Sequence, residues 1–398
     1  MKVAIVGAGA AGCFCAVNLR ELRPDAQIDV YERTKKPLQK VAITGGGRCN
    51  LTNSFNEVRS LQQVYPRGYN LMKRLFRSFD HNQTMLWWEE HGVRLVTQDD
   101  QCVFPRSQDA MEIVTTLLRG MKGVRLFLDH KIDDITELTS RYDAVVVATG
   151  GSPRPEGLSF LNSLQLEIAK PVPSLFTFNL DSPVTSLMGV VAPHAVAGLA
   201  GTRFRTEGPL LITHWGMSGP AILKLSSHAA RWLAEQQYKA TLMINWVGGA
   251  NDEAVRDALT SHIRENGAKQ IGTFTPARIN ELCEAQLSHR LWLHLLETAG
   301  IDPVRRCAEI GTKQLSRLVA TLTNSTYPIV GRGSYKEEFV TCGGVALSEV
   351  NASDLSCKKC GNLYLAGEVL DVDAVTGGFN LQAAWTMGYV IANSISAQ

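Results

Sequence analysis

Residues 3–12 combine an apolar run with a glycine-rich turn, and this pairing restricts the fold more than any other part of the chain. The apolar residues lead directly into Gly7, Gly9 and Gly12, which have the spacing GxGxxG. A strand, a tight glycine turn and a helix in this order can hold a pyrophosphate on the amides and positive dipole end of the helix. We expect Gly7 to make the turn, Gly9 to admit the phosphate and Gly12 to allow close helix packing.

Glu32 follows this turn by about 20 residues, at the end of a second apolar run, where its carboxylate can accept both hydroxyls of a ribose. The alternative is an ordinary acid at the end of a strand. A glycine spacing alone occurs by chance, but its position between a strand and a helix favours a dinucleotide site. The sequence therefore predicts the start of a doubly wound α/β sheet.

Two later segments repeat the pattern of an apolar strand that ends in small residues. Residues 144–148 lead into Thr149 and Gly150, and residues 363–366 lead into Gly367 and Glu368. Small residues at the ends of buried strands let the backbone approach a ligand closely. We expect the last segment, with the glycines that precede the final helix, to complete the same cofactor site.

The composition sets few limits on function. Forty basic and 38 acidic side chains in 398 residues give a net charge of +2, so no global field requires nucleic acid or an anionic membrane, although a local basic patch stays open. Nine cysteines without a paired framework favour a reducing compartment, and we expect a cytoplasmic protein. The single CxxC at Cys357 and Cys360 lacks a second pair, so we expect no metal. No apolar run is long enough to predict a membrane span.

The order of the patterns predicts a cofactor domain interrupted by an insertion. We expect helices near 80–90, 107–119 and 380–395, with short strands at 93–96 and 102–104 between the first two. Further strands at 124–128 and 131–135 are expected to lead to the strand at 144, giving a small antiparallel sheet packed against the main sheet. In the helical region, we expect Asp302-Pro303 to begin a helix. The expected domains are a first cofactor part at 1–172, a β-rich part at 173–250 and about 324–336, a helical part at 251–323, and a second cofactor part at 337–398.

A triple glycine at positions 45–47 is the most unusual local feature. Such a run costs backbone entropy, but it lets main chain lie against a flat ring system. Lys40, Arg48 and Asn50 supply donors for phosphate or carbonyl oxygens beside it. The alternative is a flexible surface loop, which rarely combines three glycines with so many positioned polar groups.

Several segments together resemble the HI0933-like flavoprotein family. They are Lys40 with the run TGGGRCNLTN at 44–53, THWGMSGP at 213–220, TCGGV at 341–345, and LAGEVLDVD at 365–373 with TGGFNLQ at 376–382. The resemblance covers essentially the whole chain. It implies bound FAD and a three-layer two-dinucleotide-binding-type domain, with a parallel sheet, a small antiparallel sheet, and an inserted β-barrel plus helical domain.

The resemblance also implies which residues hold FAD. The ADP half would lie on the first glycine turn and Glu32, with the Ile132 backbone at the adenine. The amides at the start of the last helix would face flavin N1 and the C2 carbonyl, where negative charge develops on reduction. The full expected set is Gly7, Gly9, Ala10, Ala11, Gly12, Glu32, Arg33, Lys40, Gly46, Gly47, Arg48, Cys49, Asn50, Ile132, Thr149, Gly150, Gly367, Glu368, Gly377, Gly378 and Phe379.

Two residues are candidates for catalysis. Cys49 lies next to Arg48, which could lower the pKa of its thiol, but a redox mechanism usually needs a second cysteine and a packing role is the alternative. His214 lies among small residues and could protonate a substrate, and a structural hydrogen bond is the alternative.

Three functions remain open. The first is an NAD(P)H-linked reductase that passes a flavin N5 hydride to an activated C=C bond of an unidentified substrate. Because no second GxGxxG follows a strand, the donor would visit transiently. The second is a dihydrouridine synthase acting on ribosomal RNA, since the family is associated with that reaction and with bile-acid pathways. The third is a non-enzymatic flavin-binding module.

Residues 65–79 bear on the RNA hypothesis because they alternate basic and aromatic side chains. Such a pattern is typical of a surface that follows a nucleic-acid backbone and stacks bases. The alternative is an amphipathic helix with Leu71, Leu75 and Phe79 in the core and a solvated basic face.

Overall fold

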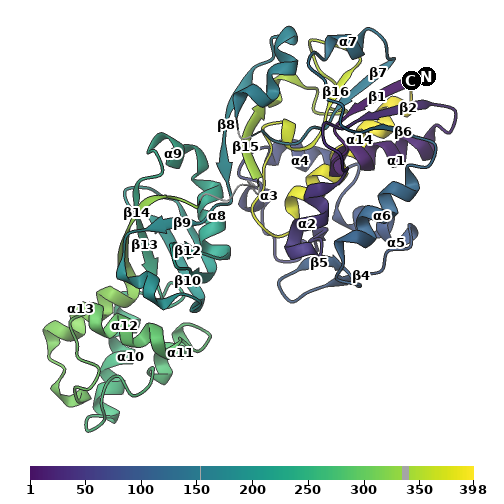
Figure 1. Ribbon diagram of the computed structural model, residues 1–398. Coiled ribbons are helices and arrows are strands. Elements are labelled where there is room, and N and C mark those ends of the chain that lie inside the picture. The colour runs from purple at the N-terminus through teal and green to yellow at the C-terminus, as the bar shows by residue number, and fades with distance from the viewer. Residues whose placement is uncertain (153, 334–339) are drawn as a thin grey trace. The chain divides into compact units, whose positions relative to one another are not determined.

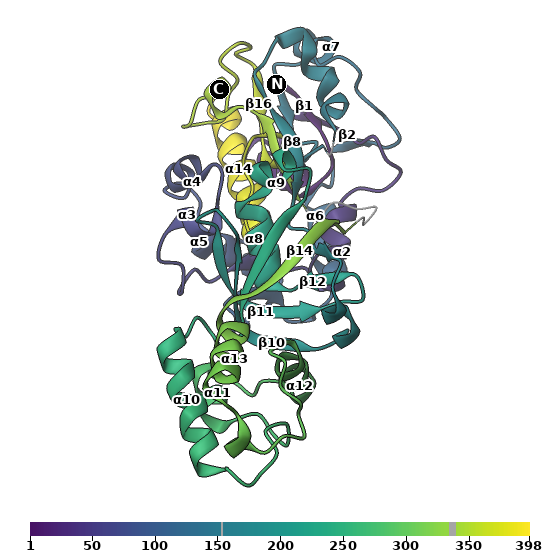
Figure 2. The same cartoon turned by 90° about the vertical axis from the view of Figure 1, so that its left-hand side faces the viewer.

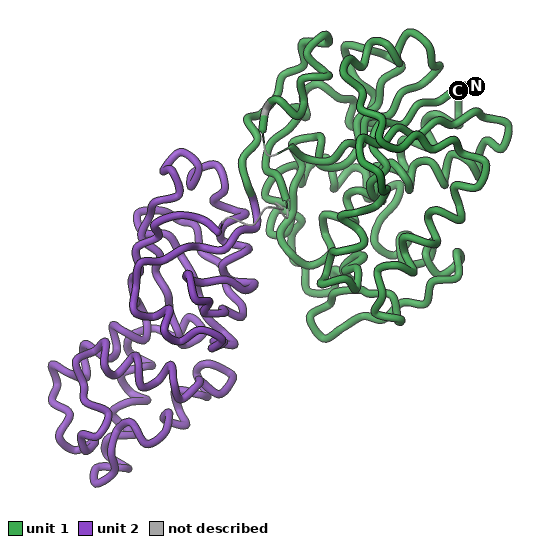
Figure 3. Tube along the Cα trace, in the orientation of Figure 1, with its two compact units in different colours: residues 1–173, 340–398 green, residues 174–339 purple. Residues whose placement is uncertain are grey.

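The computed structural model describes residues 1–152, 154–333 and 340–398 and consists of two compact units (Figure 3). Unit 1 combines Met1–Pro173 with Val340–Gln398, and unit 2 is Ser174–Phe339. Unit 1 is therefore discontinuous in sequence. The domain ends expected at 336 and 337 lie outside the described residues.

Unit 1 is built on a five-stranded parallel sheet with the order β16-β7-β1-β2-β6 (Figure 1). Val3 lies opposite Ile28 on one side and Ala144 on the other. The central strands are almost wholly buried and apolar, as expected of a parallel sheet covered on both faces. The strands are β1 (Lys2–Val6), β2 (Gln27–Tyr31), β6 (Arg125–Phe127), β7 (Ala144–Val147) and β16 (Leu363–Leu365).

Helices from both ends of the chain pack against each other in unit 1. These are α1 (Ala10–Leu22) and α14 (Phe379–Ser396). A Cβ built on Gly388 would lie 2.7 Å from the Ala11 carbonyl oxygen, so a glycine is needed at this crossing. The other helical segments are α2 (Gln39–Gly47), α3 (Leu61–Val64), α4 (Tyr69–Leu75), α5 (His81–Glu90), α6 (Ala110–Gly120), α7 (Thr136–Thr139), η1 (Pro155–Leu164), η4 (Leu347–Glu349) and η5 (Gly367–Val369).

The small antiparallel sheet of unit 1 is present, and two of its strands lie at the expected strands 93–96 and 102–104, whereas the strands expected at 124–128 and 131–135 are not part of it. It consists of β3 (Thr52–Asn53), β5 (Cys102–Pro105) and β4 (Leu95–Thr97) in that order, and β8 (Ile168–Ser174) pairs separately with β15 (Val340–Val345). The predicted strand at 124–128 instead joins the parallel sheet as β6, and residues 131–135 form no strand. A short apolar run indicates a strand without indicating its partner, which explains the error.

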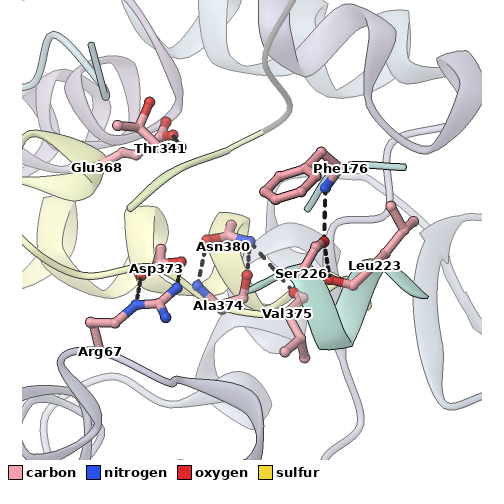
Figure 4. A network of polar contacts seen from close by, with 10 residues as sticks. All are labelled: Arg67, Phe176, Leu223, Ser226, Thr341, Glu368, Asp373, Ala374, Val375 and Asn380. Atoms are coloured by element: carbon pink, nitrogen blue, oxygen red, sulfur yellow. Dashed lines mark hydrogen bonds and ion pairs between the residues drawn. The ribbon is translucent and has the colours of Figure 1, made fainter. Parts of the chain in front are cut away.

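Unit 2 contains a closed barrel with the order β10-β11-β12-β9-β14-β13 (Figure 2). The strands are β9 (Phe178–Leu180), β10 (Val191–Leu199), β11 (Arg205–Ile212), β12 (Gly216–Ser218), β13 (Ala240–Asn245) and β14 (Ser325–Arg332). The helical segments are η2 (Pro183–Leu187), α8 (Pro220–His228), α9 (Ala230–Glu235), α10 (Asp252–Glu265), α11 (Ala277–Leu282), α12 (His289–Thr298), η3 (Cys307–Glu309) and α13 (Thr312–Asn324). In this unit Ser226 accepts a hydrogen bond from the Phe176 amide and donates one to the Leu223 carbonyl, at 2.9 Å each (Figure 4).

The helical part of unit 2 packs as its apolar spacing predicts, with Leu291, Leu295, Leu318 and Leu322 fully buried. One predicted helix start is wrong. Asp302 and Pro303 begin a turn, because the Asp302 side chain accepts from the Val304 amide and its carbonyl from the Arg305 amide. Across the ranges that the structure describes, we find no helix with the length and apolarity of a membrane span and no cluster of three or more metal-ligating side chains.

The crossing of α1 and α14 gives a stability test. We expect Gly388→Ala to lower the free energy of unfolding by about 1–3 kcal/mol, because the added methyl meets backbone that cannot rotate away. Chemical denaturation measures the change. Gly361→Ala is the matched control, since a Cβ there meets nothing within 4 Å, and we expect a change within about 0.5 kcal/mol. Equal effects of the two substitutions would contradict the close approach.

Candidate functional site

The carboxyl ends of four parallel strands bring together segments that are far apart in the sequence. Gly7 follows β1, Glu32 follows β2, Thr149 follows β7, and Gly367 follows β16. Because these strands are neighbours in one parallel sheet, all four residues lie at the same edge. In open α/β sheets this edge is where ligands bind.

The three glycines of the first turn differ in why they must be glycine. Gly7 has φ +106°, and a Cβ there would overlap the Ala148 carbonyl, while a Cβ on Gly12 would overlap the Gly7 carbonyl. Gly9 has φ −91°, and a Cβ there would meet nothing within 4 Å. The protein itself therefore needs glycine at Gly7 and Gly12. At Gly9 the protein leaves open space, which we call the cradle. Gly9 also gives helix α1 no side-chain cap, so the amides of its first turn lack a partner from that residue.

Glu32 is held directly against this turn. One carboxylate oxygen accepts from the Ala8 amide at 2.9 Å, and the other accepts from the Thr34 amide at 2.9 Å and hydroxyl at 2.7 Å. A carboxylate has about four acceptor positions, so capacity remains for a ligand hydroxyl. Arg33 is exposed beside it, and Ile132 is half-buried against the core of unit 1.

Glu368 links three segments at the other side of the edge. Its carboxylate accepts from the Thr341 amide at 2.6 Å, and both residues are drawn in Figure 4. The same carboxylate pairs with the Lys40 ammonium at 3.3 Å. The preceding Gly367 has φ +75°. Lys40 and Glu368, predicted independently to contact the cofactor, are thus brought together, with Gly150 close to the same carboxylate.

The triple-glycine segment is partly helical. It lies at the end of α2, where Thr44, Gly45 and Gly46 leave helical geometry, and Gly45, Gly46 and Gly47 all have positive φ. A Cβ on Gly46 or Gly47 would meet nothing within 4 Å. Both glycines therefore face open space, as a segment that lies against a ligand would.

Asn50 joins this segment to the start of α14. With its amide oriented to satisfy its neighbours, the side chain donates to the Thr52 carbonyl at 3.0 Å and accepts from the Gly378 amide at 3.3 Å. Asn53 also donates to the Gly377 carbonyl at 3.2 Å, and a Cβ on Gly378 would overlap the Thr52 carbonyl. The triple-glycine segment and the last glycine pair are therefore one structure.

Helix α14 directs its N-terminus to this junction. Gly378 is its N-cap, with φ +88° and no side-chain cap, so the first amides of an 18-residue helix have no partner within the helix. The Phe379 ring packs inward against Phe55, with ring centroids 5.1 Å apart. We therefore expect any ligand contact of Phe379 to be through its backbone.

Arg48 and Cys49 are neighbours in sequence, but their side chains lie in different surroundings. The Arg48 guanidinium lies over the Phe104 ring, 4.6 Å from its centroid, and donates to the Gly45 carbonyl. Cys49 is fully buried, and burial raises the pKa of its thiol to about 12. The interpretation that Arg48 lowers this pKa is therefore wrong, because burial of the thiol raises it. At neutral pH Cys49 is a protonated thiol, which favours the packing role.

His214 lies in unit 2, in the tight connection between β11 and β12. The Thr213 amide donates to the Gly216 carbonyl at 2.8 Å and closes the turn. The His214 side chain is exposed, and its ring packs edge-on against the Trp215 ring, with the ring centroids 3.8 Å apart.

The segment 65–79 is an amphipathic structure, as the alternative interpretation stated. Leu71, Leu75 and Phe79 are buried, and Tyr65 is fully buried with its hydroxyl donating to the Phe379 carbonyl at 2.8 Å. The prediction that Tyr65 or Phe79 stacks on bases is therefore wrong. The basic residues Lys73, Arg74 and Arg77 remain exposed.

Sequence reasoning missed the buried ion pair between Arg67 and Asp373. A signal was present, because Asp373 lies between two apolar residues, Val372 and Ala374. An acid in an apolar run that is to be buried needs a cationic partner.

Comparison with known proteins places this site in context. The family model described as HI0933-like protein Rossmann domain matches residues 1–394. The chain is 26% identical to the ribosomal RNA dihydrouridine synthase of Escherichia coli, over 99% of this chain and 97% of that protein. It is also 26% identical to the 3-dehydro-bile acid delta(4,6)-reductase of Clostridium scindens, over 98% and 97%. A solved 3-ketosteroid delta1-dehydrogenase from Sterolibacterium denitrificans aligns with a TM-score of 0.48 and 11% identity, over 99% of both chains.

Gly9 gives a direct test of the cradle. We expect Gly9→Val to abolish the binding of FAD, because the side chain would occupy the open space in which we expect the pyrophosphate to lie. The free energy of unfolding of the FAD-free protein should change by no more than about 0.5–1 kcal/mol, since a Cβ at this position meets no protein atom within 4 Å. The 450 nm flavin absorbance of purified protein and denaturation of the apoprotein measure the two effects. A yellow variant, or a strongly destabilised apoprotein, would show that Gly9 serves another purpose.

Proposed function

Because this chain belongs to the HI0933-like family and is an FAD-dependent oxidoreductase, we propose that it saturates a carbon–carbon double bond conjugated with a carbonyl group. The names of two relatives support this reaction. Dihydrouridine differs from uridine by saturation of one such bond in the uracil ring, and a delta(4,6)-reductase acting on a 3-dehydro-bile acid removes double bonds conjugated with the 3-ketone. The proposed substrate of this chain has the same conjugated arrangement.

The open cradle at Gly9 is the observation that carries the FAD site. We propose that the amides of Ala10 and Ala11 hold the pyrophosphate and that Glu32 binds the adenosine ribose, since its carboxylate is already fixed beside the turn. Gly46 and Gly47 face open space at the triple-glycine segment, where a ring system can approach. When bound, reduced FAD supplies the hydride for the reaction.

The start of α14 gives this site its electrostatic character. Asn50 engages the Gly378 amide, which leaves the following amides of the first turn and the positive end of the helix dipole for a ligand. Donors fixed in this way stabilise negative charge without reorganising. We propose that they stabilise the reduced flavin at N1 and the C2 carbonyl.

The proton donor and the electron donor are further parts of the proposal. His214 is our candidate acid, because its imidazole is exposed and histidine is the side chain that most often transfers protons in catalysis. NAD(P)H is our candidate reductant, and it would visit transiently because the sequence contains no second GxGxxG that follows a strand. A non-enzymatic flavin module is not supported, since both relatives named above are enzymes.

We expect reduced enzyme to be reoxidised anaerobically by 2-cyclohexenone at least tenfold faster than by cyclohexene, because only the conjugated bond accepts a hydride readily. Stopped-flow recovery of the flavin absorbance at 450 nm measures both rates.

If His214 is the acid, the variant His214→Gln should keep its flavin content but turn over at least tenfold more slowly. Equal rates with the two acceptors would contradict the proposed reaction, and full activity of the variant would remove His214 from it.

A second candidate function is dihydrouridine synthesis in ribosomal RNA. It is favoured by the exposed cations Lys73, Arg74 and Arg77 on and after α4, together with the name of the E. coli relative. Side chains of this kind neutralise backbone phosphates and release counterions.

For this candidate we expect binding of an rRNA fragment to weaken steeply with salt, and the slope of log K against log salt to fall by about 2 in the double variant Arg74→Glu, Arg77→Glu. Fluorescence anisotropy over a salt series measures the slope. The matched control is Lys122→Glu with Arg141→Glu, which changes the net charge equally at exposed positions elsewhere in unit 1. Absent or salt-independent binding, or the same loss in the control, would exclude this surface.

A further inference from the structure

The segment 64–68 lies along the chain that leads into helix α14. The Val375 amide donates to the Val64 carbonyl at 2.9 Å, and the backbones of Arg67 and Asp373 form an antiparallel bridge. A Cβ on Gly68 would lie 2.5 Å from the Val372 side chain, so the two stretches are in close contact. We call residues 64–68 the brace.

An ion pair fixes the brace to this stretch. Two guanidinium nitrogens of Arg67 donate to the two carboxylate oxygens of Asp373 (Figure 4). The Asp373 side chain is fully buried and that of Arg67 is 11% exposed. A buried ion pair contributes little net stability because both charges lose their hydration, but its two-point geometry fixes orientation. Orientation is therefore the property for which such a pair is suited.

The stretch that the brace supports has few means of holding itself in place. Residues 371–378 form no regular helix or strand, and Gly377 and Gly378 have φ of +126° and +88°. Asn380 ties the stretch locally, accepting from the Ala374 amide and donating to its carbonyl (Figure 4). The Tyr65 hydroxyl of the brace then donates to the Phe379 carbonyl in the first turn of α14.

We propose that Arg67 and Asp373 are positioning residues that fix the N-terminus of α14 and thereby set the reduction potential of the bound flavin. This inference rests on the FAD site of the proposed function but not on the identity of the substrate. The attraction between the helix amides and the reduced flavin depends on the position of the amides. A displaced α14 start would lose more affinity for the anionic reduced flavin than for the neutral oxidised form.

The test compares flavin potentials in two arginine variants. Arg67→Met leaves Asp373 without this partner, and we expect the reduced flavin to lose at least tenfold more affinity than the oxidised flavin. For a two-electron couple, that difference lowers the midpoint potential by about 30 mV. Equilibration of FAD-saturated protein with reference dyes measures it without any substrate. Arg67→Lys keeps the charge but not the two-point geometry. If Arg67→Met yields no folded protein, we measure Arg67→Lys instead and expect the midpoint potential to fall by the same amount.

Arg125→Met is the matched control. Arg125 also makes a two-point pair with a buried aspartate of unit 1, Asp29, but this pair joins β2 and β6. We expect its midpoint potential to equal that of the wild type, even if its thermal stability falls. An unchanged potential in the Arg67 variant, or an equal shift in the control, would overturn the inference. If the Arg67 variant shows the expected shift in potential but 2-cyclohexenone and cyclohexene reoxidise the reduced enzyme at equal rates, the result counts against the proposed reaction alone.

Discussion

The parallel pairing on either side of β7 is the constraint on which the rest of this structure depends. β7 has β1 on one side and β16 on the other, so the turn after residue 6 and the turn after residue 365 lie at the same edge of the sheet. The intervening chain includes all of unit 2, yet it must return to this position. The crossing of α1 and α14, with Gly388 against the Ala11 carbonyl, depends on the same return. The cofactor site that we propose therefore has residues from both ends of the chain.

The local parts of this arrangement could be predicted from the sequence, because each follows from a short-range rule. A strand followed by GxGxxG specifies its own turn, and the structure shows why Gly7 and Gly12 are needed. Partners could not be predicted in the same way. The short run at 125–127 has the composition of a strand in either direction, and only the sheet determines that it pairs with β2 in parallel.

Side-chain direction was the other property that the sequence did not reveal. The proximity of Arg48 to Cys49 suggested a lowered thiol pKa, but the positive φ of Cys49, +61°, accompanies a side chain buried in the core while the guanidinium lies over Phe104. Tyr65 is similar, since an aromatic residue in a basic segment is equally compatible with a base-stacking surface and with the core. The direction of these side chains depends on packing between segments that are distant in sequence. A local sequence pattern indicates only which residues are close along the chain.

The relatives indicate how far the function can be carried over. Two proteins whose names state chemically unlike substrates, a ribosomal RNA and a bile acid, match this chain equally well along its length. Overall similarity therefore cannot select a substrate. The reaction that we propose needs a conjugated double bond, and the FAD site that we propose in unit 1 has the Gly9 cradle at one end and the α14 N-terminus at the other. The features that choose between RNA and a small molecule must then lie outside this cofactor frame, in exposed groups such as the α4 cations.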